Sequence, residues 1–343
     1  MTTLVVTGSQ PDAHDLPGHP EHAGRLQAVR RRLGEDGLLE RVRSESLRPV
    51  DPSLLGAVHT PQHLDQLQAT ARLPGSRMLE PDTYATPRSY EIACLAAGGT
   101  VRAVEAVLAG EARNAAALIR PPGHHATRSR AMGFCLINNV AVAARHALRV
   151  QGVERVAIVD YDVHHGNGTQ DIFYDDPAIL YLSTHQSPLY PGTGSMTETG
   201  RGAGWGFTLN VPLPPGVGDE GFWQVFCAVV LPALDRFRPD LVLVSLGFDA
   251  HWADPLANLA LSLSGYDRLA RCLIEGAETW CAGRIVFVME GGYDLEVLSC
   301  GWANLIRALL GDEGAADPLG SARGWTPDVR PIIEELRYIH GLP

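Results

Sequence analysis

Three short apolar runs in this chain each lead directly into a cluster of polar, reactive side chains. The runs are residues 155–159, 241–246 and 285–289, and they are rich in β-branched residues without polar alternation. Such runs are typical of strands buried on both faces of a parallel sheet. In such sheets ligands bind outside the carboxyl ends of the strands, so we expect the polar clusters to meet in one crevice. The clusters are residues 160–165, 247–249 and 290–293.

Apolar positions at helical spacing separate and surround these strands. Alternating strands and helices with right-handed crossovers predict an α/β fold with one central parallel sheet flanked by helices. No repeat or linker-like tract interrupts the pattern, so residues 1–343 are predicted to form a single domain. We expect helices at residues 25–39, 61–71, 89–110, 140–150, 221–237, 264–280 and 331–338, a further strand at 115–119, and a loop at 212–218.

The composition, with 45% hydrophobic and 20% charged residues in 343, is that of a soluble globular enzyme. No apolar run approaches the ~20 residues that span a bilayer, and the N-terminus does not resemble a signal peptide, so no membrane association is expected. The net charge of −11 argues against nucleic-acid binding. Six cysteines without CxxC spacing predict reduced, buried thiols and a cytoplasmic protein.

The first polar cluster has the spacing of a metal site. Asp160, Asp162 and His164 alternate, so in extended backbone their side chains share one side. Asp162 and His164 suit one metal ion, and Asp249 at another strand tip supplies a third ligand, a place for which His251 competes. Two carboxylates and an imidazole are the ligand set of a catalytic zinc that keeps one position open for water. A charged loop with capping aspartates is the alternative, but such a group of charges after a buried strand is costly without a ligand.

Two further clusters carry groups that suit hydrolysis. His124 and His125 follow a predicted strand on a proline-containing loop, so both rings can enter one cleft near the metal. Gly291 and Gly292 allow a sharp turn and a close backbone approach before Tyr293. A tyrosine in that position can donate its hydroxyl to a developing oxyanion.

The order of these motifs resembles the zinc-dependent histone deacetylase superfamily, which includes acetylpolyamine amidohydrolases and bacterial histone deacetylase-like amidohydrolases. The resemblance covers nearly the whole chain, is highly specific, and implies an arginase/deacetylase-like fold. The sequence of residues 162–170, DVHHGNGTQ, is similar to that of the class II branch rather than class I. The matching stretches are PGHPEHAGRL (17–26), RPPGHHA (120–126), GFCLINN (133–139), VDYDVHHGNGTQDIFY (159–174), YPGTG (190–194), LNVPL (209–213), SLGFDAHWADPL (245–256) and MEGGYDL (289–295).

The resemblance implies a role for each matching catalytic residue. The tandem histidines match His124 and His125, of which His125 is the expected general base and acid. Asp160 matches the carboxylate behind His124, whereas Asn167 stands behind His125 where class I members have Asp. A neutral partner should leave His125 less basic, which suits a base that must start neutral. The zinc ligands match Asp162, His164 and Asp249, and the catalytic tyrosine matches Tyr293.

The resemblance also implies a substrate channel and monovalent cation sites. Phe134, next to Gly133, and Tyr190 match the two aromatic residues that flank the channel, and Leu256 matches an apolar rim residue. A segment that contains Asp82 borders the channel mouth. Structural K⁺ or Na⁺ is expected at one site with Asp160, Asp162, His164, Ser183 and Thr184, and at a second with Phe173, Asp176, Ile179 and Phe207.

Together these features predict a zinc-dependent deacetylase that hydrolyses an acylated primary amine, in first place acetyl-lysine, to acetate and free amine. An acetylpolyamine amidohydrolase would use the same metal centre but needs acidic groups at the channel mouth. A ureohydrolase needs a two-metal set that this pattern does not supply. A catalytically inactive acyl-lysine-binding protein is the alternative of another class. The acyl length, the physiological amine and the oligomeric state, a homo-oligomer included, are left open.

Overall fold

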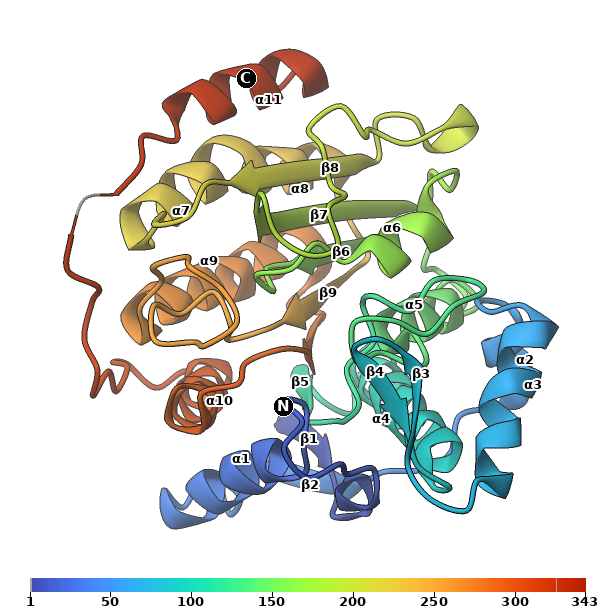
Figure 1. The fold of residues 1–343 in the computed structure, drawn as a ribbon. Helices are drawn as coiled ribbons and strands as arrows, with labels where there is room; N and C mark the ends of the chain where they lie inside the picture. The colour runs from blue at the N-terminus through green and yellow to red at the C-terminus, as the bar shows by residue number, and fades with distance from the viewer. Residues whose placement is uncertain (1, 325) are drawn as a thin grey trace.

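The structure, a computed structural model, describes residues 2–324 and 326–343. In these residues eight parallel strands form one sheet in the order β2-β1-β5-β10-β9-β6-β7-β8, with helices on both faces (Figure 1). A separate antiparallel hairpin consists of β3 (Arg77–Glu80) and β4 (Thr83–Ala85). The strands of the main sheet are β1 (Thr3–Thr7), β2 (Arg43–Ser46), β5 (Asn114–Ala117), β6 (Val156–Asp160), β7 (Ile179–Gln186), β8 (Thr208–Leu213), β9 (Leu241–Leu246) and β10 (Ile285–Met289).

The sheet separates two hydrophobic cores because its strands are buried on both faces. Val5 of β1, for example, packs into one core, whereas its neighbours Leu4 and Val6 pack into the other. The first core is covered by α1 (Gly24–Glu35), α7 (Asp219–Val225), α8 (Leu231–Phe237), α9 (Leu263–Cys281), α10 (Leu295–Leu310) and α11 (Arg330–His340). The second is covered by α2 (Pro52–Gly56), α3 (Pro61–Ala69), α4 (Ser89–Leu108), α5 (Asn139–Ala147) and α6 (Asn167–Phe173). Short 3₁₀ turns lie at Gln10–Ala13, Thr70–Arg72 and Gly202–Gly204.

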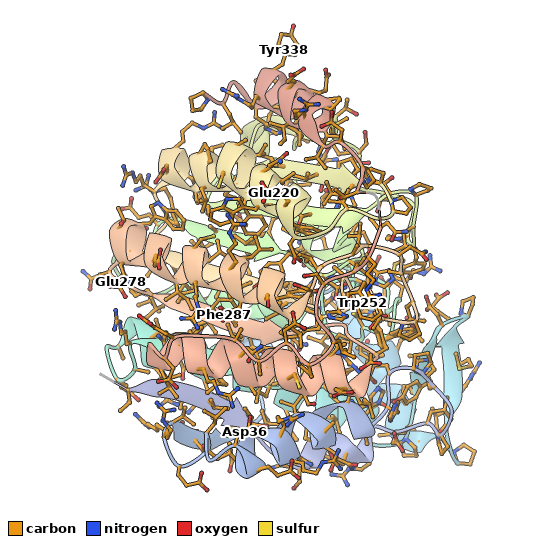
Figure 2. The ribbon with its side chains drawn as sticks, turned by 90° about the vertical axis from the view of Figure 1, so that its left-hand side faces the viewer. Asp36, Glu220, Trp252, Glu278, Phe287 and Tyr338 are labelled. Atoms are coloured by element: carbon orange, nitrogen blue, oxygen red, sulfur yellow. The ribbon has the colours of Figure 1, made fainter. Side chains whose placement is uncertain are left out.

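Figure 2 shows the first of these helix layers from outside, with α9 and α10 in front of the sheet. Phe287 of β10 is fully buried behind these helices, whereas Tyr338 projects from α11 and is 85% exposed. Phe287 and Tyr338 thus illustrate a fully buried and a strongly exposed aromatic side chain. The helix layer covers the centre of the sheet, and α11 extends the layer toward its β8 edge.

The predicted parallel sheet and its three central strands are confirmed, but the sequence analysis named no range for β1, β2, β7 or β8 of this sheet. The apolar part of β1 is only Leu4-Val5-Val6, too short to stand out from its threonine neighbours. The edge strand β2 is polar, and most of its residues are exposed, so no apolar pattern marks it. That residues 1–343 form one domain stays a prediction.

Two predicted elements differ in detail around prolines. The helix expected at 221–237 is present as one unbroken helical run from α7 to α8, with a π-helical turn at Phe226–Val230 between them. Pro232 has no N–H to donate to the carbonyl four residues before it, and the wider turn just ahead of α8 accommodates this gap. The loop expected at 212–218 begins late, because β8 continues to Leu213 through Pro212. An edge strand such as β8 tolerates proline on its unpaired side.

All six cysteines are free thiols, as expected, but the prediction that they are buried is wrong for half of them. Cys135, Cys281 and Cys300 are buried, whereas Cys94 and Cys272 are half-buried and Cys227 is exposed. In the described part of the chain, no helix combines the length and apolarity needed to cross a membrane.

Candidate active site

Four loops that follow adjacent strands build the candidate active site. Strands β5, β10, β9 and β6 are neighbours in the sheet, and each ends in one of the predicted reactive clusters. Because all four strands are parallel, their carboxyl ends lie on the same edge of the sheet. The structure therefore brings together residues that are up to about 170 positions apart, such as His124 and Tyr293.

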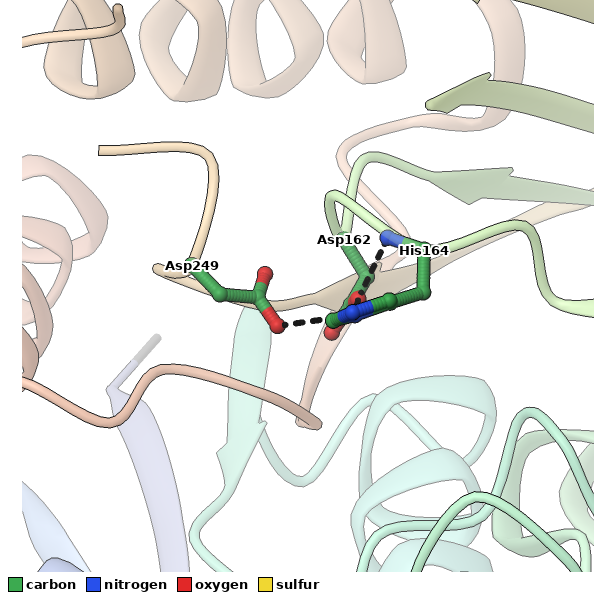
Figure 3. A group of neighbouring side chains, drawn as sticks. All are labelled: Asp162, His164 and Asp249. Atoms are coloured by element: carbon green, nitrogen blue, oxygen red, sulfur yellow. Dashed lines mark hydrogen bonds and ion pairs between the residues drawn. The ribbon is translucent and has the colours of Figure 1, made fainter. Parts of the chain in front are cut away.

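The proposed metal ligands form a buried three-residue group (Figure 3). Asp162, His164 and Asp249 each offer one ligand atom, and these atoms lie within 4.8 Å of one another. Oδ1 of Asp162 lies 3.2 Å from Nδ1 of His164, and Oδ2 of Asp249 lies 3.3 Å from the same nitrogen. Although Oδ2 of Asp249 is buried, no described residue donates a hydrogen bond to it. An unpartnered carboxylate oxygen beside an imidazole and a second carboxylate fits a divalent cation with mixed N/O ligands.

The charges of Asp162, His164 and Asp249 also favour a bound cation. Burial opposes protonation of His164, but its hydrogen bond to Asp162, its close approach to Asp249 and the charges of both carboxylates raise its pKa to about 10. Burial raises the pKa of Asp249, and the nearby charge of Asp162 raises it further. Two buried carboxylates that face each other require positive charge between them. A site that attracts a proton so strongly is suited to hold a metal cation in its place.

Two glycines let the backbone approach the ligand carboxylates. A Cβ atom at Gly247 would lie 2.1 Å from Oδ2 of Asp162, and one at Gly291 would lie 2.0 Å from Oδ2 of Asp249. Both distances are far below van der Waals contact, so no side chain fits at either position. The amide of Gly291 also donates to Oδ2 of Asp162 at 2.8 Å, which ties the tyrosine loop to the three-residue group.

The tandem histidines are adjacent in the sequence, but they have different partners. Nδ1 of His124 lies 3.1 Å from Oδ2 of Asp160, whereas Nδ1 of His125 lies 2.8 Å from Oδ1 of Asn167. Burial opposes protonation of both. The charges of Asp162 and Asp160 nevertheless raise the pKa of His124 to about 10. Burial and then the charges of His124 and His164 hold the pKa of His125 well below its usual range. His125 is therefore the neutral member of the pair, and its second ring nitrogen is free to accept a proton.

Tyr293 is held by the groups around its turn. Gly292 has a φ of 113°, a conformation that favours glycine, and its carbonyl accepts a 2.7 Å hydrogen bond from Nε of Arg25. The guanidinium of Arg25 also lies 4.8 Å from the centre of the Tyr293 ring. On another side, the ring of Phe134 meets that of Tyr293 edge to face, with the ring centres 5.7 Å apart.

The two aromatic residues predicted to flank a channel lie next to His125 and Tyr293. Tyr190 is 38% exposed, and its ring meets that of His125 edge to face, with the centres 5.2 Å apart. The Gly133–Phe134 turn has positive φ at both residues, and Oδ1 of Asp82 accepts from the Gly133 amide at 3.3 Å. Leu256 is half-buried on the loop that follows Asp249. The competing residue His251 is not part of the three-ligand group; its ring stacks on that of Trp252.

Comparisons with known proteins agree with this geometry. The chain matches the family model described as "Histone deacetylase domain" over residues 19–309. The chain belongs to the histone deacetylase family. It is 45% identical over 299 residues to a "Probable deacetylase" of Archaeoglobus fulgidus, a match that covers 86% of this chain and 82% of that protein. It is 43% identical over 321 residues to the "Histone deacetylase-like amidohydrolase" of Pseudomonas aeruginosa, covering 92% of this chain and 83% of the relative.

A solved structure supports the same assignment. The "Crystal Structure of HDA15 HD domain" matches with a TM-score of 0.90 and 36% sequence identity, covering 99% of this chain and 94% of that chain. The expected family and the arginase/deacetylase-like fold are thus confirmed. As a member of the histone deacetylase family, the protein is a hydrolase of the deacetylase type, and the family is typically zinc-dependent.

The sequence analysis missed a buried ionic cluster next to the Gly292–Tyr293 turn of the site. Nε and Nη2 of Arg120 donate to the two carboxylate oxygens of Glu21 at 2.6 and 2.8 Å, and Nη1 of Arg25 donates to the same carboxylate at 3.3 Å. All three side chains are fully buried. Burial alone would raise the pKa of Glu21, but the charge of Arg120 and its hydrogen bonds lower the pKa to about 2. Glu21 and Arg25 are four residues apart, but no spacing links either one to Arg120.

Two other acidic residues of the site also escaped the sequence analysis. Oε2 of Glu290 accepts from the amides of Gly123 and His124 at 2.6 and 3.2 Å, which joins the tyrosine loop to the histidine loop. Burial raises the pKa of Glu290 to about 7. Asp254 accepts from the amide of Tyr293 at 2.7 Å. Both residues stand inside the recognised motifs, but nothing in their spacing indicates which amides they bind.

The residues expected at the monovalent cation sites fall into two groups. Ser183 pairs with Asp160 across β6 and β7, and the hydroxyl of the next residue, Thr184, is buried without a partner among the described residues. The second group lies near the opposite end of β7, which begins at Ile179. There the carbonyls of Phe173, Asp176 and Phe207 accept backbone hydrogen bonds from Asp176, Ile179 and Tyr181 at 3.0, 3.3 and 2.9 Å.

Proposed function

We propose that this histone deacetylase-family protein is a zinc-dependent hydrolase that removes the acetyl group from acetyl-lysine side chains. The observation that carries the proposal is the meeting of Asp162, His164 and Asp249 with the neutral His125 and with Tyr293 at one edge of the sheet. A bound zinc ion would polarise the acyl carbonyl and lower the pKa of a water molecule toward ~7. The remaining groups supply the proton transfers and the oxyanion contact that amide hydrolysis requires.

The proposed division of roles follows from the charge states. His125 is neutral and can accept a proton from the attacking water, and it can later donate that proton to the leaving amine. Its Nδ1 bond to Asn167 fixes the ring without adding negative charge. His124 carries positive charge beside Asp160 and stabilises negative charge that develops nearby. Tyr293 donates its hydroxyl to the oxyanion of the tetrahedral intermediate.

We propose acetyl-lysine rather than acetylpolyamine as the substrate, on account of the groups near the channel. Phe134 and Tyr190 offer apolar surface, which favours a methylene stem by ~0.8 kcal/mol for each buried CH₂. A cationic polyamine stem would need an unpaired carboxylate along its path. Glu80 is unsuited to this because both of its oxygens pair with Arg130, at 2.9 and 2.6 Å. Asp82, whose Oδ1 accepts from the amide of Gly133 at 3.3 Å, has no arginine partner among the described residues and is the carboxylate that would favour the polyamine alternative. Leu256, at the proposed channel rim, adds an apolar side chain and no charge.

The decisive experiment compares kcat/KM for an acetyl-lysine peptide and for N8-acetylspermidine, with zinc content measured on the same preparation. We expect the peptide to be preferred by the wild-type protein. Leu256→Glu places a carboxylate at the proposed rim and should shift the ratio toward the polyamine, whereas the neutral control Leu256→Gln should not. A tenfold preference of the wild type for acetylspermidine would make the protein an acetylpolyamine amidohydrolase. Absence of turnover with both substrates at full zinc occupancy would support the inactive acyl-lysine binder.

We also propose that K⁺ or Na⁺ occupies the group formed by Asp160, Asp162, His164, Ser183 and Thr184. The buried, unpartnered hydroxyl of Thr184 supports this proposal, because such a polar atom is costly without a partner. The second proposed site is formed by the backbone carbonyls of Phe173, Asp176, Ile179 and Phe207. Elemental analysis after dialysis against K⁺ and against a bulky organic cation should detect the retained ion.

A further inference from the structure

One buried carboxylate connects two loops of the active site. Asp254 is buried, and the described residues give it three backbone N–H donors. Its Oδ1 accepts from the amide of Leu256 at 2.9 Å, which closes a tight Asx turn across Pro255. Its Oδ2 accepts from the amide of Tyr293 at 2.7 Å and more weakly from that of Asp294 at 3.4 Å.

The amide of Tyr293 depends on this carboxylate. Among the described residues, Asp254 is the only hydrogen-bond acceptor for that amide. The preceding residue, Gly292, has a φ of 113° and can rotate more freely than a residue with a side chain. Arg25 fixes the carbonyl of Gly292 and covers the tyrosine ring, but it makes no hydrogen bond to the main chain of Tyr293 itself. Without Asp254, the turn could therefore tilt at Gly292 and carry the hydroxyl of Tyr293 away from its place.

We propose that Asp254 is a positioning residue of the deacetylase reaction: by binding the main chain of Tyr293 it sets the place of the tyrosine hydroxyl, and by the same carboxylate it fixes the channel rim at Leu256. This inference rests on the proposed role of Tyr293 as the oxyanion donor. Asp254 does not touch the reacting atoms. Its effect on the reaction passes through Tyr293, and this distinguishes it from a residue that only stabilises the fold.

The carboxylate is needed because both of its oxygens accept. Asparagine has nearly the same shape, but only one of its two side-chain atoms accepts hydrogen bonds. In Asp254→Asn, either the Leu256 amide or the Tyr293 amide therefore faces an NH₂ group and loses its acceptor. A displacement of the tyrosine hydroxyl of about 1 Å would cost up to ~10²-fold in rate.

The test is a double-mutant cycle on the zinc-loaded protein with an acetyl-lysine peptide. Asp254→Asn should lower kcat by ~10- to 100-fold, with KM and zinc content nearly unchanged. In the Tyr293→Phe background the hydroxyl is absent, so adding Asp254→Asn should lower kcat by less than about threefold. Equal losses in both backgrounds, or wild-type kcat in Asp254→Asn, would overturn the inference. If Tyr293→Phe alone keeps wild-type kcat, the proposed role of the tyrosine fails instead, and the two failures are distinguishable.

A second measurement does not depend on activity. Hydrogen–deuterium exchange of peptides that cover residues 290–295 should be faster in Asp254→Ala than in the wild type, because this variant has neither oxygen and the amides of Tyr293 and Asp294 lose their acceptor. The matched control is Asp240→Ala. Asp240 likewise accepts two consecutive backbone amides, those of Glu154 and Arg155 at 2.9 Å each, but it lies just before β9, at the other end of that strand.

The control variant should keep wild-type kcat and wild-type exchange at residues 290–295. If Asp254→Asn does not accumulate as folded protein, Asp254→Glu keeps both acceptor oxygens but moves them by one methylene. It should show the same dependence on Tyr293, and a kcat equal to that of the wild type would overturn the inference. Unchanged exchange at residues 290–295 in a folded Asp254→Ala protein would overturn it as well.

Discussion

At the scale of single residues, the site shows how a neighbour decides the chemistry of a side chain. His124 and His125 have the same ring and are both buried. The charges of Asp162 and Asp160 overcome burial and keep a proton on His124, whereas burial and the charges of His124 and His164 leave His125 without one. A base must start neutral, so only one of the two can begin the reaction.

The first prediction concerns this pair. His125→Ala should lower kcat by ~10²- to 10⁴-fold, the usual contribution of a general base and acid, whereas His124→Ala should cost less. Both variants should retain their zinc, because neither histidine is a member of the three-ligand group. Steady-state kinetics with parallel elemental analysis tests this. If His124→Ala is the slower variant at equal zinc content, the two roles must be exchanged.

The second prediction concerns the tyrosine hydroxyl. Tyr293→Phe should fold, keep one zinc ion and lose ~10²–10³ in kcat, the usual effect of removing one oxyanion donor. The ring contacts with Phe134 and Arg25 do not involve the hydroxyl, so the fold and the turn should survive. Thermal unfolding and kcat measured on the same zinc-replete sample check the two parts separately. Wild-type turnover would remove Tyr293 from the mechanism.

The sequence predicted which residues meet at the edge of the sheet better than it predicted the residues that hold them. Asp162, His164 and Tyr293 follow apolar strands, and the carboxyl ends of parallel strands lie at the same edge of the sheet. Arg25 and Asp254 act through backbone carbonyls and amides of distant loops. Backbone groups have the same chemistry at every position, so no residue type marks which of them a distant side chain will bind.

At the scale of elements, the strand ends impose tight limits on the loops that follow. After β9 and β10 the backbone passes so close to the ligand carboxylates that only glycine fits at 247 and 291. The central strands β6, β9 and β10 were predictable because a strand that is buried on both faces needs an apolar residue at nearly every position. The polar edge strand β2 and the π-helical turn ahead of Pro232 were not, since local sequence rules conflict there with the tertiary context.

The third prediction tests this closeness. Gly291→Ala places a methyl group 2.0 Å from Oδ2 of Asp249, so the carboxylate must move and the metal site should be disrupted. We expect the variant to lose zinc and activity together, as Asp249→Ala should, while circular dichroism shows a folded protein. Gly56→Ala is the control, because a Cβ atom there meets no described atom within 4 Å. A fully zinc-loaded Gly291→Ala protein would contradict the prediction.

At the scale of the whole molecule, a buried carboxylate joins the N-terminal segment to the catalytic edge. Glu21 pairs with Arg120, which precedes the histidine loop, and with Arg25, which holds the tyrosine turn. Two arginines and one carboxylate thus bring together segments that are about 270 residues apart in the chain. Such a cluster costs desolvation energy, and it stabilises the fold only while all its members keep their charge.

The fourth prediction is a pH dependence of stability that arises from Glu21. Its pKa is lowered from 4.5 to about 2 in the folded protein, so its stabilisation is complete above about pH 4.5 and is lost as the pH falls toward 2. The difference corresponds to about 3 kcal/mol, at about 1.4 kcal/mol for each pH unit. Urea unfolding of the wild type at pH 7, 4.5 and 3 should show this loss. In Glu21→Gln the part that depends on Glu21 should disappear.

The same variants separate the buried pair from an ordinary surface pair. At pH 7, Glu21→Gln should be destabilised by about 3–5 kcal/mol, because it leaves Arg120 buried without its counter-charge. The control Glu91→Gln removes the exposed partner of Arg88 and should cost less than about 1 kcal/mol. Equal stabilities of the two variants would mean that the buried cluster does not support the fold.

The crowding at Gly247 and Gly291 also gives a criterion for interpreting the sequences of other members of the family. The presence of Asp162, His164 and Asp249 does not by itself decide whether a chain can hold a metal. In this geometry a chain can keep all three and still be unable to bind the ion, because a single methyl group at either glycine would occupy the space of a ligand oxygen. These two positions should therefore be inspected together with the ligands when a relative is classified as an enzyme or as a protein that only binds acylated lysine.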